Sequence, residues 1–76
     1  MKNLLEFIIK SIVSNPNDVV IEESETPSET ILLVKANKDD YGKIIGKNGR
    51  VIQSLRSIIK TANKDKNKKY FIKISE

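Results

Sequence analysis

Apolar residues near the N-terminus repeat at the spacing of an amphipathic helix. They are Leu4, Leu5, Ile8, Ile9, Ile12 and Val13. Asn3 followed three residues later by Glu6 has the pattern of a capping box, and Pro16 should end the helix. The apolar arc covers roughly half the helix circumference, and Phe7 lies at its edge. This helix therefore either meets a partner through part of its surface or wraps the edge of the domain.

Three later segments have the pattern of β-strands. Residues 19–22 and 30–36 are rich in β-branched residues and are separated by a polar stretch, 24–29, so they should form a hairpin. The second segment is almost entirely apolar, which is typical of a central strand with neighbours on both sides. Near the C-terminus, Tyr70, Ile72 and Ile74 alternate as the inward positions of a half-buried strand do.

Between the hairpin and the last strand the pattern is helical again. Asn37 can cap a short helix, and the carboxylates of Asp39 and Asp40 suit the positive end of its dipole. From Gly49 onward a second helix places its apolar residues within an arc of about 120°. They are Val51, Ile52, Leu55, Ile58, Ile59 and Ala62.

The element order is therefore α-β-β-α-α-β. The last two strands are joined by a crossover through two helices and should pair in parallel, beside an antiparallel hairpin. The sequence predicts an α+β fold in which a three-stranded mixed sheet packs against three helices.

Length and composition restrict the possible functions. The 76 residues are enough for one small domain with a marginal core. The chain has no Cys and no His, so it lacks a disulfide framework, thiolate metal ligands and the commonest general base. We therefore expect no enzymatic activity, no metal and no cofactor. The chain also shows no targeting signal and no apolar run of membrane-spanning length, which predicts a cytoplasmic protein without membrane insertion.

The charges are distributed unevenly along the chain. Residues 1–41 contain four basic and eight acidic side chains, whereas residues 42–76 contain ten basic and two acidic ones. This asymmetry is expected of a surface that binds a polyanion. The alternative for the Lys-rich stretch 64–69 is a solvated connector. The acidic stretch 22–29 is interpreted as a solvated hairpin tip rather than a metal site.

All three glycines of the chain lie close together, where the positive charge begins. Gly46 and Gly49 bracket the dipeptide Lys47-Asn48, and because they lack Cβ atoms another backbone can approach the chain closely. Lys47 and Arg50 add positive charge, and the amides that open the following helix can bind an anion such as a phosphodiester. The alternative is an ordinary corner between two helices, capped by glycine.

Residues 45–55 resemble the I-G-x-x-G-x-x-I-x-x-L signature of the KH domain, and the element order resembles the type II KH fold over essentially the whole chain. We therefore expect a single KH domain over residues 1–76. Residues 39–50 resemble the KhpA family of small stand-alone bacterial KH proteins. The resemblance implies binding of single-stranded RNA by a chaperone or post-transcriptional regulator, since KH domains hold about four nucleotides over this loop.

The resemblance also implies roles for individual residues around the loop. Gly46 and Gly49 would admit the sugar-phosphate backbone. Phosphates would be neutralised by Lys43, Lys47 and Arg50, and Asn48 would add an amide contact. Ile45 and Ile52 would face an apolar groove that receives the bases. Tyr41, the aromatic residue nearest the motif, either stacks on a base or packs within the fold.

A single KH domain binds weakly, so the resemblance also implies a homodimer or a pair with the larger KhpB protein. Two surfaces are candidates for the contact: the first helix, and the far half of the motif helix around Ile58 and Ile59. The rival hypothesis is a protein-interaction module that uses the fold for dimerisation and in which the glycine loop is a structural corner.

Overall fold

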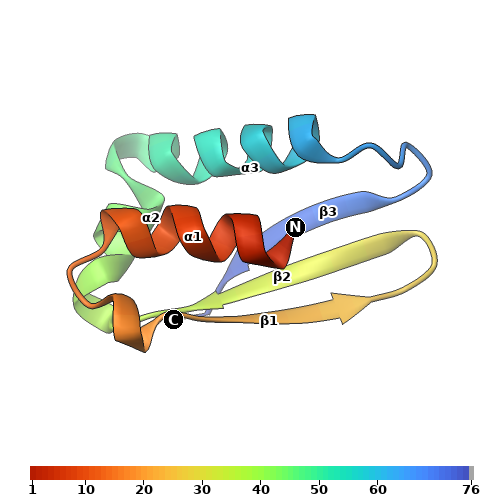
Figure 1. Ribbon diagram of the computed structural model, residues 1–76. Coiled ribbons are helices and arrows are strands. Elements are labelled where there is room, and N and C mark those ends of the chain that lie inside the picture. Colours follow the sequence, from red (N-terminus) through yellow and green to blue (C-terminus); the bar gives the residue numbers. More distant parts are fainter. Residues whose placement is uncertain (76) are drawn as a thin grey trace.

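The computed structural model describes residues 1–75, which form a layer of helices on one face of a β-sheet (Figure 1). In chain order the elements are α1 Lys2–Ile12, β1 Val20–Glu25, β2 Glu29–Lys35, α2 Tyr41–Ile45, α3 Arg50–Ala62 and β3 Lys69–Ile74. Short 3₁₀ turns occupy Pro16–Asp18, Lys38–Asp40 and Lys47–Gly49. The predicted α+β fold and its element order are confirmed, and the arrangement is that of a type II KH domain.

The sheet has the strand order β1-β2-β3, with β2 in the centre as its apolar sequence predicted. β1 and β2 pair in antiparallel fashion, with Ile21 opposite Val34. β2 and β3 pair in parallel, with Leu32 opposite Ile72. The crossover from β2 to β3 contains α2, the glycine loop and α3, so both ends of the loop segment are fixed by the sheet.

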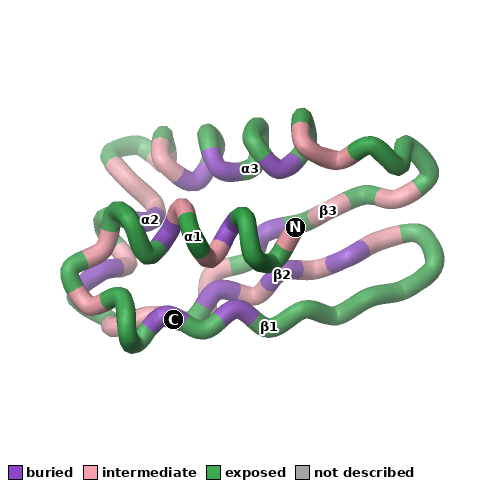
Figure 2. Tube along the Cα trace, in the orientation of Figure 1, coloured by how far each residue is buried: buried purple, intermediate pink, exposed green. Residues whose placement is uncertain are grey.

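The core lies between the helices and the covered face of the sheet. Its buried apolar residues are Leu5, Ile9, Val19, Ile21, Leu32, Val34, Ile44, Ile52, Leu55, Ile59 and Ile72. In Figure 2 the buried positions of α3 recur on the side of the helix that faces the sheet. Every third or fourth residue of α3 is buried because the helical repeat returns to the same side at that spacing.

The predicted start and end of the first helix are wrong. α1 is capped by the Met1 backbone without a side-chain hydrogen bond, so Asn3 and Glu6 form no capping box. Glu6 instead accepts a hydrogen bond from Lys10 Nζ at 2.8 Å, because the i,i+4 spacing places the two side chains together. The helix ends at Ile12, well before Pro16, which opens a 3₁₀ turn.

Two acidic residues of the hairpin pair with lysines. Glu22 lies 2.5 Å from Lys35 Nζ, and Glu25 pairs with Lys68. Within residues 1–75, no three Asp or Glu side chains are grouped so that they could hold a metal ion. In the same part of the chain, no helix has both the length and the apolar character needed to cross a membrane.

Candidate nucleic-acid interface

The glycine loop joins α2 to α3 through three residues with positive φ. They are Gly46 (φ 77°), Asn48 (φ 57°) and Gly49 (φ 74°). The amide of Gly46 donates to Gly42 O at 2.8 Å and ends α2, and the amide of Gly49 donates to Gly46 O at 3.1 Å. Glycine adopts positive φ without strain, and asparagine is among the residues that tolerate it best. The residue types of the loop therefore match its backbone conformation.

The structure gives a different account of each of the three glycines. A Cβ atom on Gly46 would lie 2.8 Å from both N and Cβ of Val51, so this position allows α2 and α3 to meet at the loop. At Gly49 the nearest atom to such a Cβ is Ile52 Cγ2 at 3.9 Å, so only the backbone conformation favours glycine there. A Cβ on Gly42 would meet nothing within 4 Å. The sequence alone does not distinguish these three positions.

Positive groups gather at the tip of the loop. Lys47, Asn48 and Arg50 are exposed, and within residues 1–75 neither Lys47 nor Arg50 forms an ion pair. α3 starts directly after Gly49 and has no side-chain cap; the Arg50 amide donates to Lys47 O, and the following amides of the first turn are not capped by a side chain. The helix dipole adds to the positive potential at the same place. This arrangement can bind a phosphate with both backbone amides and cationic side chains.

A second basic feature is a groove of about 590 Å³ between α3, β3 and their connector. It is lined by Arg56, Lys60, Asn63, Lys66, Lys68, Lys69, Tyr70 and Phe71. Arg56 Nη2 donates to Ile72 O at 3.3 Å, which holds this flank of α3 against β3. Arg56 lies about 9 Å along the helix axis from Arg50, at a rise of about 1.5 Å per residue. The loop and the groove therefore follow each other along one helix.

The comparison with protein families decides what kind of KH domain this is. A profile described as KhpA/KhpB, KH domain, matches residues 2–74. The chain belongs to the KhpA/KhpB family. The RNA-binding protein KhpA of Clostridium perfringens is 40% identical over 97% of this chain and 99% of its own length. Its counterpart in Oceanobacillus iheyensis is 36% identical with the same coverage.

RNA-binding protein KhpA of Listeria monocytogenes is 33% identical over the full length of both chains. These names denote RNA-binding proteins and not enzymes. No solved structure matches the chain.

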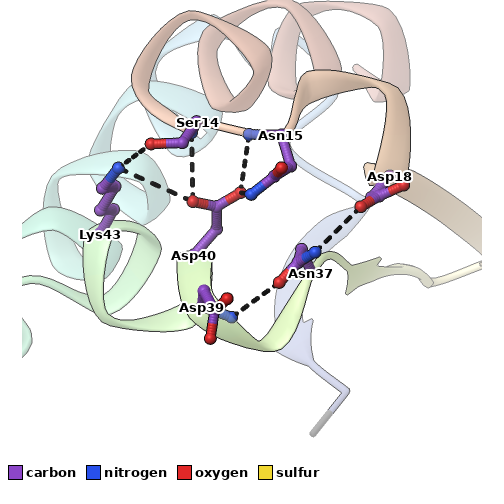
Figure 3. Close-up of polar contacts among 7 residues, drawn as sticks. All are labelled: Ser14, Asn15, Asp18, Asn37, Asp39, Asp40 and Lys43. Carbon is purple, nitrogen blue, oxygen red and sulfur yellow. Dashed lines mark hydrogen bonds and ion pairs between the residues drawn. The ribbon is translucent and has the colours of Figure 1, made fainter.

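Three of the residues singled out in this KhpA/KhpB-family chain lie away from the exposed tip. Lys43 Nζ is 3.8 Å from Asp40 Oδ1 and donates to Ser14 Oγ, so its charge is directed toward the segment after α1 (Figure 3). Ile45 is half-buried against the core, and Ile52 is a core residue that is 6% exposed. Their contacts with RNA stay predictions.

The groove contains residues that sequence reasoning did not assign to the site. Arg56 and Lys60 were not singled out, and Tyr70 was interpreted only as an inward strand position. The available signal was the i,i+4 spacing of Arg56 and Lys60, which places both on the flank that faces β3. Tyr41 packs within the fold, because it is half-buried and its hydroxyl oxygen accepts a hydrogen bond from Ala36 N at 3.4 Å.

A buried carboxylate anchors the helix that leads into the loop. Asp40 has no exposed surface and accepts hydrogen bonds from Ser14 N (3.1 Å), Asn15 N (2.9 Å) and Asn15 Nδ2 (3.1 Å) (Figure 3). These bonds tie the segment after α1 to the start of α2. Asn37 caps the 3₁₀ turn Lys38–Asp40 that leads into α2, since its Oδ1 accepts a hydrogen bond from Asp39 N at 2.9 Å. The sequence indicated a dipole contact for Asp40 but not this tertiary role.

The hydrogen bonds to Asp40 make the stability of the fold depend on pH. Burial raises the pKa of Asp40, but the hydrogen bonds from Ser14 and Asn15 and the charge of Lys43 lower it by more, so the net pKa lies below the usual value. The ionised carboxylate therefore stabilises the fold fully above the unfolded-state pKa, about 3.9. This contribution is lost as the pH falls through the lower folded-state pKa.

Asp40→Asn is expected to lower the melting temperature by about 5 °C or more at pH 7. The difference from the wild type should shrink as the pH falls below about 4, where Asp40 of the unfolded chain becomes protonated, and should be smallest below the lower folded-state pKa. Thermal denaturation followed by circular dichroism between pH 7 and pH 3 measures both quantities. Asp39→Asn, at an exposed neighbour, is the matched control and should have little effect. An Asp40→Asn deficit that is as large at pH 3 as at pH 7 would contradict the assignment.

Proposed function

We propose that this protein binds single-stranded RNA, with the sugar-phosphate backbone passing over the Gly46-Lys47-Asn48-Gly49 loop. The observation that carries the proposal is the exposed Lys47-Asn48 tip immediately before the uncapped N-terminus of α3. Gly46 and Gly49 leave room for the backbone, and Lys47 and Arg50 supply charge for the phosphates. The RNA-binding names of the full-length KhpA relatives support the same conclusion.

From the loop, the strand follows α3 into the basic groove. Phosphates on this path meet Arg56 and Lys60, and bases enter beside Tyr70, which offers aromatic surface. Lys43 would join the phosphate contacts only by exchanging its ion pair with Asp40 for one with RNA. Such a site reads charge and stacking more than base edges, so binding is broad. Broad binding suits the role of RNA chaperone or post-transcriptional regulator that we propose for it.

Salt dependence tests the proposed RNA binding. With three or four phosphates neutralised, the slope of log K against log salt concentration should be about −2 to −3, at about −0.7 per phosphate. Fluorescence anisotropy with a labelled oligoribonucleotide from low to moderate salt measures it, and a duplex of the same sequence serves as the control. A salt-independent affinity, or tighter binding of the duplex, would support the rival hypothesis of a protein-interaction module.

We further propose that the working species is a dimer, with itself or with a KhpB-like KH protein. Arg56 bonds to β3, so the opposite flank of α3, which carries Ile58 and Ala62, faces away from β3. α1 lies on the same side of the sheet as α3 in Figure 1 and exposes Leu4 and Ile12 in part. Both candidate surfaces named from the sequence therefore keep exposed apolar residues.

The structure separates the two isoleucines considered for the contact. Ile58 is 42% exposed and lines a shallow apolar hollow with Ser57, Thr61 and Ala62, whereas Ile59 is 1% exposed and belongs to the core. Ile59 is therefore removed from the proposed contact surface.

Ile58→Asp is expected to weaken dimerisation at least about tenfold, roughly 1.4 kcal/mol, because a charge would be buried in an apolar contact. Sedimentation equilibrium at micromolar concentration measures the dissociation constant, and circular dichroism verifies folding. Gln53→Asp, an exposed change elsewhere on α3, should leave the dimer intact. A wild-type protein that is monomeric and binds RNA undiminished would refute the dimer.

A further inference from the structure

The face of the sheet that the helices leave open carries an aromatic residue between two lysines. Along β3, Tyr70, Ile72 and Ile74 pack against the core, so the alternate residues Lys69, Phe71 and Lys73 face the other side. Phe71 is 43% exposed and both lysines are exposed. In the register of the sheet Phe71 lies opposite Ile31, and Lys73 lies opposite Leu33. Figure 1 shows α1, α2 and α3 on the other face of the sheet.

The charged residues of this open face differ between the β1 side and the β3 side of the sheet. On the β1 side, Glu22 is paired with Lys35 at 2.5 Å. On the β3 side, Lys69 and Lys73 form no ion pair with any carboxylate of residues 1–75, although Glu29 lies opposite Lys69 in the register. The β3 edge therefore offers two cations to an external anion.

The open face is continuous with the basic groove. Phe71 and Lys69 line the groove and also belong to the outward row of β3, so the groove ends where this row begins. A strand of nucleic acid that leaves the groove at this end meets Phe71 first. Alternation of lysine, phenylalanine and lysine matches the alternation of phosphates and bases along a single strand.

We propose that RNA longer than the groove can hold continues over the β3 edge onto the open face, where one base stacks on Phe71 and Lys69 and Lys73 hold phosphates. This inference rests on the proposed RNA-binding function and extends it from one face of the fold to two. The binding site for long RNA is then larger than the roughly four nucleotides that the loop and groove hold.

Oligonucleotide length separates the open face from the loop and groove. Affinity is measured by fluorescence anisotropy for a tetranucleotide and a dodecanucleotide with wild type, Phe71→Leu and Phe71→Tyr. Phe71→Leu keeps apolar bulk but removes the aromatic ring, and should weaken dodecanucleotide binding about fivefold or more while the tetranucleotide affinity is unchanged. Phe71→Tyr retains stacking and should behave as wild type. Lys73→Gln should reduce the salt slope by about 0.7 for the dodecanucleotide alone.

The outcomes distinguish the two proposals. Equal affinity of Phe71→Leu and wild type for the dodecanucleotide, or an equal loss at both lengths, overturns the open-face inference and leaves the loop site standing. If variants of the loop lose tetranucleotide binding and Phe71→Leu does not, the result supports the proposed function independently of Phe71. A further outcome is that Phe71→Leu dissociates the dimer and changes RNA binding only because of that dissociation. This outcome would assign the open face to contact with a second copy and would also overturn the inference.

Discussion

Lys47→Asp combined with Asn48→Asp is expected to weaken the binding of single-stranded RNA about 10- to 100-fold, or roughly 1.4 to 3 kcal/mol. Both side chains are exposed at the loop tip, and the change of −3 in charge would repel the phosphate that we propose binds at the start of α3. The flanking Gly46 and Gly49 keep their conformations, so the fold should be intact. Fluorescence anisotropy gives the affinity, and circular dichroism verifies folding.

The chain provides a matched control for this double variant. Lys2-Asn3 is the same dipeptide, equally exposed, at the start of α1. Lys2→Asp with Asn3→Asp therefore makes the same charge change at a site outside the proposed interface. It should reduce RNA affinity only slightly, through the net charge of the protein. Similar losses in the two double variants would show that net charge, and not the loop, determines binding.

Gly46→Ala is expected to lower the free energy of unfolding by about 2 to 6 kcal/mol. The backbone conformation of Gly46, with φ 77° and ψ 169°, costs an L-residue about 1 to 3 kcal/mol, and forcing a methyl group against Val51 costs about 1 to 3 kcal/mol. A domain of this size has a total stability of only about 4 to 11 kcal/mol, so the loss would be a large share of the total. Urea denaturation measures the change.

Gly42→Ala is the control for Gly46→Ala, because a methyl group there meets no atom within 4 Å and the residue lies within α2. It should be neutral or stabilise the protein by up to about 1 kcal/mol through helix propensity. Equal stabilities for the two alanine variants would show that the tight contact at Gly46 relaxes easily. The explanation of the loop by close packing of α2 and α3 would then be wrong.

The sequence predicted the elements well because its apolar spacings are regular. Tyr70, Ile72 and Ile74 alternate in β3, and the buried residues of α3 recur at helical spacing, so both elements follow from periodicity. The start of α1 was predicted wrongly because Glu6 had two possible partners. A local pattern does not reveal that the Glu6 carboxylate pairs with Lys10 instead of bonding to the amides at the helix N-terminus.

The site was predictable only where its chemistry is local. The loop residues from Gly46 to Arg50 are consecutive, so their types alone suggest a phosphate contact. The roles of Asp40 and Arg56 depend on segments far away in the chain: Asp40 binds Ser14 and Asn15, and Arg56 binds Ile72. Helical spacing also placed Ile58 and Ile59 together, whereas only the packing of α3 on the sheet shows which of them is exposed.

The parallel pairing of β2 and β3 determines when the RNA-binding surface can form during folding. The β1-β2 hairpin joins neighbours in the chain and can form early, whereas β2 and β3 meet only after the whole crossover has been closed. The loop and α3 lie inside that crossover, and the groove is completed by β3 itself. A partly folded chain that retains the hairpin but has lost β3 therefore has no groove. On the proposed binding path, RNA bound in the groove would stabilise the closed crossover and slow its opening, so it would protect the long-range half of the fold more than the hairpin.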